Sequence, residues 1–203
     1  MKRLLAVFVL IVASASAYAQ APVILVFGDS ISAGYGLRLE QGWVELLKTR
    51  LQSQGYGYQV VNASVSGETT AGGLARLPRA LELHQPKIVI LELGGNDGLR
   101  ALPIAQMRAN LTQMVTLAAA TGAKVLLLGM RMPPNYGPEY TKQFALAFSD
   151  LANEKKIASV PFLLTDIALS PNLLQGDDIH PNALGQPILL DNVWPALKPL
   201  LHK

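Results

Sequence analysis

Cysteine is absent from this 203-residue sequence, and histidine occurs only three times. Without cysteine the chain has no disulfide, no thiolate nucleophile, no cysteine-ligated zinc and no lipid-modified cysteine anchor. A hydrophobic core alone must therefore hold the fold. The apolar fraction of 50% and the chain length are sufficient for one such domain.

A large excess of charge of one sign is also missing. The sequence has 17 Lys and Arg residues against 14 Asp and Glu residues. Two of the basic residues, Lys2 and Arg3, lie in a segment that we expect to be removed, which leaves 17 − 2 = 15 basic residues. No cluster of Lys and Arg marks a nucleic-acid surface, so we expect no nucleic-acid partner.

The first residues have the layout of a secretory signal peptide. Met1-Lys2-Arg3 is basic, residues 4–13 are apolar, and Ala17-Tyr18-Ala19 supplies small residues around a cleavage site. The apolar run is shorter than the about 20 residues that a bilayer-spanning helix needs, so we expect no stable membrane anchor. We predict a signal peptide over residues 1–19, with cleavage after Ala17 or Ala21 as alternatives. The protein would then be exported, to the periplasm or beyond the cell.

Short apolar runs alternate with amphipathic stretches through residues 20–203, which we expect to form one domain. Buried strands are predicted at residues 22–28, 58–62, 87–94, 123–129 and 158–162. The stretches between them have helical spacing, and prolines 78, 187, 195 and 199 should end or kink their helices. The alternation predicts an α/β fold, a three-layer α/β/α sandwich whose mainly parallel five-stranded sheet has the order 2-1-3-4-5.

Small and polar residues follow each of the first three predicted strands. Gly28-Asp29-Ser30 ends the first, "NASVSGETT" with Gly67 follows the second, and "GGNDG" with Asn96 follows the third. These strands would be neighbours in the predicted order, and ligands bind at the carboxyl ends of such strands. We expect Asp29 and Asp97 to be turn and cap residues at this edge.

One histidine is placed to take part in catalysis. His202 lies beside the C-terminus, and His84 lies in a polar turn at the amino end of a strand, the wrong edge. His180 remains, in "GDDIHPN". Asp177, three residues earlier, can curl back to Nδ1 and leave Nε2 free as a base, whereas the carboxylate of Asp178 should point away.

Together these groups predict nucleophilic catalysis at a carbonyl carbon. Ser30 would attack, His180 would take the proton and return it to the leaving group, and Asp177 would orient the imidazole. The backbone N–H groups of Ser30 and Gly67 and the side-chain amide of Asn96 are candidates for an oxyanion hole.

Four sequence blocks, "FGDSISAGYG", "GETT", "GGND" and "DDIHPN", resemble those of the SGNH hydrolases, the GDSL esterase and lipase superfamily, in the same order. The family's Ser, Gly, Asn and His fall on Ser30, Gly67, Asn96 and His180, and its acid falls on Asp177. "GGNDGLR" and "RMPPNYGPEY" are similar to the exported bacterial group of multifunctional acyl-CoA thioesterase I, protease I and lysophospholipase enzymes, also called arylesterases.

The resemblance implies a flavodoxin-like fold, hydrolysis of esters and thioesters, and no metal or organic cofactor. It also implies an oxyanion hole from Ser30, Gly67 and Asn96, and a mobile loop after Asn96 that closes on acyl chains. The partner is then a small-molecule acyl ester or thioester, and a monomer is the default. A sugar-ester deacetylase is an alternative within the same class.

Other classes match the motifs less well. A nucleotide- or flavin-binding protein would share the fold class, but Gly34-Tyr35-Gly36 lacks the third glycine, because residue 39 is leucine. The nucleophile elbow of an α/β-hydrolase would need glycine at Ser32. A non-catalytic binding module would not require a complete set of triad and oxyanion residues.

Overall fold

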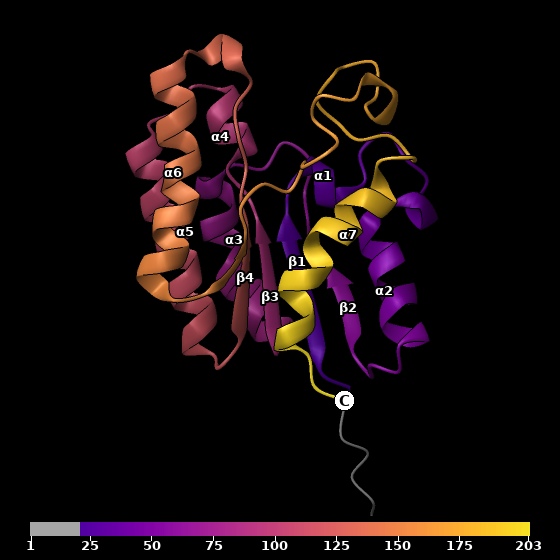
Figure 1. Ribbon diagram of the computed structural model, residues 1–203. Coiled ribbons are helices and arrows are strands. Elements are labelled where there is room, and N and C mark those ends of the chain that lie inside the picture. The colour runs from indigo at the N-terminus through magenta and orange to yellow at the C-terminus, as the bar shows by residue number, and fades with distance from the viewer. Residues whose placement is uncertain (1–20) are drawn as a thin grey trace, which may run out of the picture.

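The computed structural model describes residues 21–203, in which five strands form one parallel sheet between two layers of helices (Figure 1). The strands are β1 (Val23–Gly28), β2 (Gln59–Asn62), β3 (Ile88–Glu92), β4 (Lys124–Leu128) and β5 (Ala158–Val160). Their order is β2-β1-β3-β4-β5, so the predicted sandwich and strand order are confirmed. The predicted signal peptide, residues 1–19, lies outside the described residues.

Two helices cover one face of the sheet and three cover the other. The first pair is α2 (Trp43–Ser53) and α7 (Gln186–Leu197), and the second group is α3 (Thr70–His84), α5 (Ile104–Ala120) and α6 (Pro138–Lys155). Short helices α1 (Ser30–Ala33) and α4 (Gly95–Leu99) and the 3-10 turns η1 (Leu39–Gln41), η2 (Pro134–Tyr136), η3 (Pro171–Leu173) and η4 (Lys198–Leu200) complete the chain. Within residues 21–203, no helix combines the length and apolarity needed to cross a bilayer.

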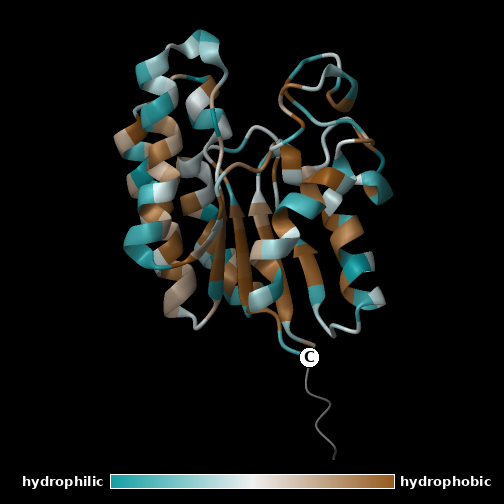
Figure 2. Ribbon diagram, in the orientation of Figure 1, coloured by the Kyte–Doolittle hydropathy of each residue, from teal (hydrophilic) through white to brown (hydrophobic). Residues whose placement is uncertain are grey.

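The core has two halves because neighbouring side chains on a strand point to opposite faces. In β1, Leu25 and Phe27 pack on the side of α3, α5 and α6, whereas Ile24 and Val26 pack on the side of α2 and α7. All four are fully buried. Figure 2 shows the strands as the most continuously hydrophobic part of the molecule, as expected for a parallel sheet covered on both faces.

Two prolines lie inside helices, and one histidine lies in a different element from the one expected. Pro78 and Pro195 lie inside α3 and α7, and neither ends its helix. An internal proline removes one backbone hydrogen bond and costs about 3 kcal/mol. Burial of the apolar face of each helix, for example Leu77 in α3, offsets this. Pro187 fits the first turn of α7, where its missing N–H is not needed. His84 is the last residue of α3 rather than part of a turn.

All five strands run in the same direction, so their carboxyl ends form one edge of the sheet (Figure 1). Helix α1 lies directly beyond the end of β1, and the long segment between β5 and α7 arches over the same edge. The fold therefore gathers the segments that follow β1, β2 and β3 beside the segment that carries His180.

Candidate active site

Ser30 stands at the junction between a buried strand and a short helix. Every residue of β1 is buried, and the strand ends at Gly28. Asp29 then caps α1, because its Oδ1 accepts a hydrogen bond from the backbone N–H of Ile31 at 3.1 Å. Ser30 is the first residue of the helix, so the strand-to-helix turn places its hydroxyl beyond the sheet edge.

His180 and Asp177 approach Ser30 from the segment between β5 and α7. The Nε2 atom of His180 lies 2.8 Å from Ser30 Oγ, and its Nδ1 lies 2.6 Å from Asp177 Oδ2. Asp177 Oδ1 also accepts the backbone N–H groups of Ile179 and His180, each at 3.0 Å. A hydroxyl, an imidazole and a carboxylate therefore lie in series.

The carboxylate in this series is held in its charged form. Partial burial by itself would raise the pKa of Asp177, but the hydrogen bonds from the His180 backbone, the His180 ring and the Ile179 backbone outweigh it and lower the pKa to about 2. Asp178 makes no side-chain hydrogen bond within residues 21–203, and its φ of +56° carries the chain through a left-handed turn. Asp177, and not Asp178, contacts the imidazole.

Two further residues hold the His180 segment against the Ser30 segment. The Gln175 side-chain amide donates to the Tyr35 carbonyl at 2.7 Å and to the Pro181 carbonyl at 3.2 Å. The Tyr35 ring lies 4.7 Å from the His180 ring, centroid to centroid. Sequence reasoning missed both roles. The adjacent Gly36 leaves room for the Gln175 amide, which a Cβ would contact, but sequence alone does not show that contact.

The candidate oxyanion donors lie in the segments that follow β1, β2 and β3. Within residues 21–203 the backbone N–H groups of Ser30 and Gly67 have no hydrogen-bond partner, so both are available to a ligand. Gly67 has a φ of +78°, a conformation that favours glycine. Asn96, in α4, donates one amide hydrogen to Asp29 Oδ2 at 3.2 Å, which leaves its second amide hydrogen for another acceptor.

Buried and exposed hydrogen bonds join the segment that follows β2 to the segment that follows β3. Asp97 accepts the Thr70 backbone N–H at 2.8 Å and the Thr70 hydroxyl at 2.6 Å. Arg100 donates to the Gly67 carbonyl at 3.0 Å. The expected turn and cap roles of Asp29 and Asp97 agree with these contacts. Because Asp97 follows Asn96 directly, the contact with Thr70 fixes the turn that carries the amide.

A buried carboxyl that sequence reasoning missed lies beneath Ser30. Glu92, the last residue of β3, is fully buried, and its Oε2 accepts the Asp29 N–H at 3.2 Å and the Ser32 hydroxyl at 2.7 Å. Burial, with the nearby Asp29 carboxylate, raises the pKa of Glu92 well above its usual range. Burial also raises the pKa of Asp29, to about 6, although hydrogen bonds from Ile31, Glu92 and Asn96 and the charge of His180 oppose that shift.

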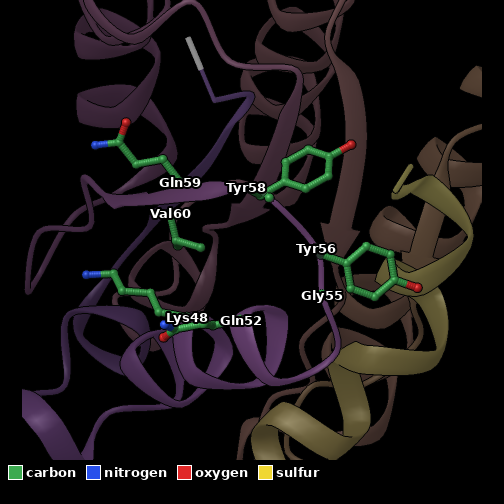
Figure 3. Close-up of a pocket in the computed structure, with 8 residues that line it drawn as sticks. Lys48, Gln52, Gly55, Tyr56, Tyr58, Gln59 and Val60 are labelled. Atoms are coloured by element: carbon green, nitrogen blue, oxygen red, sulfur yellow. The ribbon is translucent and has the colours of Figure 1, made fainter. Parts of the chain in front are cut away.

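The surface at Ser30 and His180 is a narrow crevice of about 140 Å³, whose walls include Tyr35, Leu37 and Pro181. A more open hollow, of about 1020 Å³ by the same measure, lies near the amino end of β2, between that strand and the end of α2 (Figure 3). Lys48, Gln52, Tyr56, Tyr58 and Gln59 line it, and none of the candidate catalytic residues does. In residues 21–203 no group of three or more His, Asp or Glu side chains is arranged to hold a metal ion.

A flavodoxin-like sheet with a Ser–His–Asp series at its carboxyl edge defines the class of serine hydrolases. The chain belongs to the GDSL-like lipase/acylhydrolase family, whose model matches residues 26–188. It is an enzyme of that family.

Similar proteins cover almost the whole chain. Esterase TesA of Pseudomonas aeruginosa is 54% identical over 183 residues, which is 90% of this chain and 91% of the relative. Thioesterase 1/protease 1/lysophospholipase L1 of Escherichia coli K12 is 41% identical over 184 residues, 91% of this chain and 87% of the relative. A crystal structure of TesA, 54% identical in sequence, matches with a TM-score of 0.87 and covers 88% of this chain and 99% of that one.

Proposed function

We propose that the protein hydrolyses carboxylic esters and thioesters through an acyl-enzyme intermediate on Ser30. One observation carries the proposal: Ser30 Oγ lies 2.8 Å from His180 Nε2, while Asp177 holds the other ring nitrogen at 2.6 Å. The Asp177 contact fixes the proton on Nδ1, so that Nε2 can accept the Ser30 proton.

The reaction takes place in two halves on these groups. In the first, Ser30 Oγ bonds to the carbonyl carbon as His180 takes its proton, and the leaving alcohol or thiol departs with that proton. In the second, His180 takes a proton from water as the water oxygen bonds to the acyl carbon. The bond from that carbon to Ser30 Oγ then breaks, His180 returns the proton to Oγ, and the acid is released. The N–H groups of Ser30 and Gly67 and the Asn96 amide would stabilise the oxyanion in both halves. Each such donor is typically worth about 10²–10³ in turnover.

Apolar side chains around the site favour a substrate with a hydrophobic acyl or aryl group. Ile31, Tyr35, Leu37 and Pro181 line the crevice at Ser30 and His180. The similarity to an esterase and to a thioesterase/lysophospholipase supports both oxyester and thioester substrates for this chain. We further propose that the protein is exported, because residues 1–19 have the pattern of a signal peptide. A monomer is the default oligomeric state.

The test is hydrolysis of p-nitrophenyl esters and acyl-CoA thioesters of increasing chain length by the purified protein, with Ser30→Ala in parallel. We expect turnover of both substrate types and its loss in Ser30→Ala. Activity confined to acetyl esters would support the deacetylase alternative. A folded protein that hydrolyses none of the substrates, or a Ser30→Ala variant that keeps its activity, would contradict the proposed mechanism.

A further inference from the structure

Glu92 is a carboxyl at a position where the sheet pattern requires an apolar side chain. Ile88 and Ile90, on the same face of β3, belong to the core beneath α2 and α7, and Glu92 continues that row, fully buried. Burial of a carboxyl is costly unless its hydrogen bonds are satisfied. The position opposite in β1 is Gly28, where a Cβ would lie 2.5 Å from Glu92 Oε2. The missing side chain of Gly28 therefore creates the space that the carboxyl occupies.

The two hydrogen bonds to Glu92 come from either side of Ser30. One donor is the backbone N–H of Asp29, the residue before Ser30, and the other is the hydroxyl of Ser32, two residues after it. Ser32 is held from a second direction, because the Asn62 amide donates to its carbonyl at 2.8 Å. The turn that presents Ser30 thus rests on a buried acceptor supplied by the neighbouring strand.

Asp29 extends this arrangement to the oxyanion donor. Asp29 is 3% exposed, and its carboxyl lies within hydrogen-bonding reach of Glu92. Asp29 Oδ1 accepts from the Ile31 backbone, and Oδ2 accepts from the Asn96 amide. A continuous set of hydrogen bonds therefore runs from Glu92 in the interior, through Asp29, to the amide that we assign to the oxyanion hole.

We propose that Glu92 is a positioning residue for ester hydrolysis, which fixes the Ser30 turn directly and the Asn96 amide through Asp29. This inference rests on the proposed function. Glu92 accepts from Asp29 and Ser32 and not from Ser30 Oγ, so it acts by placing the Ser30 turn and the Asn96 amide.

When Asp29 is ionised, the buried pair still holds one proton, on Glu92. Burial and the Asp29 carboxylate keep Glu92 neutral, so its carboxyl can donate to Asp29. Asp29 is then the group that titrates, with a pKa of about 6, and the ionisable groups that face it are Glu92 and His180. Above this pH, anionic Asp29 is the stronger acceptor for Asn96. Below it, protonation weakens that hydrogen bond, so turnover should fall.

Two substitutions of Glu92 separate positioning from packing. Glu92→Gln is an isostere of the neutral acid: its oxygen can accept from Asp29 and Ser32, and its amide can donate to the Asp29 carboxylate. Glu92→Ala removes every contact. Leu51→Ala, in α2 and also buried, is the control for a loss of core packing away from the site. The number of competent sites in each preparation is measured by titration with an organophosphonate that labels Ser30.

For Glu92→Ala we expect kcat per competent site to fall about 10–100-fold, with KM changed by about twofold or less. Glu92→Gln should recover kcat to within about threefold of the wild type. Its acid limb should stay at the pH of the wild type, because the glutamine amide replaces the neutral carboxyl as the hydrogen-bond donor to the Asp29 carboxylate. Leu51→Ala should lower Tm and leave kcat and the pH profile as in the wild type.

Three results would overturn the proposal: a Glu92→Ala kcat equal to that of Leu51→Ala, a Glu92→Gln kcat as low as that of Glu92→Ala, or an acid limb that moves in Glu92→Gln. If Glu92→Ala fails to fold, the activity and pH profile of Glu92→Gln decide alone. The wild type and Ser30→Ala, run alongside, test the proposed function separately. Their activities do not depend on the outcome at Glu92.

Discussion

The close approach of β1 and β3 beneath Ser30 makes a sharp prediction for Gly28→Ala. The added Cβ would lie 2.5 Å from Glu92 Oε2 and 3.0 Å from both the Glu92 carbonyl oxygen and Ser32 Cβ. The carbonyl belongs to the central part of the sheet, so the methyl group cannot be accommodated by rotation of one flexible side chain. Overpacking of this kind typically costs about 1–3 kcal/mol.

The structure also predicts where the strain is relieved. The Glu92 carboxyl is the most easily displaced of the three contacts, and its displacement breaks the hydrogen bonds to Asp29 N–H and Ser32 Oγ. We therefore expect Gly28→Ala to lower the free energy of unfolding by about 1–3 kcal/mol and kcat by about tenfold or more. Urea unfolding and p-nitrophenyl ester hydrolysis measure the two effects.

Gly57→Ala is the matched control. Nothing lies within 4 Å of its added Cβ, and it is not among the glycines with positive φ. Gly57→Ala should leave kcat intact and raise stability by about 0.4–1 kcal/mol, because alanine restricts the unfolded chain. A Gly28→Ala variant as stable and active as Gly57→Ala would refute the close packing on which the argument rests.

Three further predictions follow from the site and the amino terminus. Asp177→Asn should lower kcat about 10²–10⁴-fold, because it disturbs the tautomer of His180. Asp178→Asn should change kcat about threefold at most, because its left-handed backbone position suits asparagine. Equal losses of kcat in the two variants would contradict the assignment of Asp177 as the acid. The raised pKa of Asp29 means that the folded state binds a proton more tightly than the unfolded chain, so Asp29 favours folding below its unfolded pKa and this contribution is lost as pH rises through about 6. The free energy of unfolding of Asp29→Asn, relative to the wild type, should therefore be higher at pH 8 than at pH 5, as urea titrations at both values would measure. The absence of such a gain would show that the pKa of Asp29 is not raised in the folded state. N-terminal sequencing of the exported protein should begin at Gln20, and an intact Met1 would contradict the signal peptide.

The fold could be predicted from sequence because its strands are buried on both faces. Runs such as Val23–Gly28 are continuously apolar, and their alternation with amphipathic stretches fixes the layer architecture. The ends of the helices are harder to predict from sequence. Pro78 is expected to end or kink its helix, and α3 continues through it. Leu77 and Leu81 pack against the core on either side of Pro78, and that packing becomes visible only in three dimensions.

The candidate site also contains residues that the sequence predicts and residues that it does not. Ser30, Gly67, Asn96, Asp177 and His180 belong to short motifs whose residue types already indicate a reaction. Glu92 and Gln175 belong to no such motif. Glu92 becomes informative only when the β1–β3 register places it opposite Gly28, and Gln175 only when its segment meets Tyr35. Residues that position others through long-range contacts leave little trace in the local sequence.

The most direct test of the central claim is the mass of the intact protein after brief reaction with an organophosphonate ester, followed by peptide mapping. The account predicts one adduct per chain, located on Ser30, together with loss of esterase activity in the same proportion. Ser30→Ala should remain unlabelled. An adduct on another residue, or full esterase activity in the labelled protein, would contradict the assignment of Ser30 as the nucleophile.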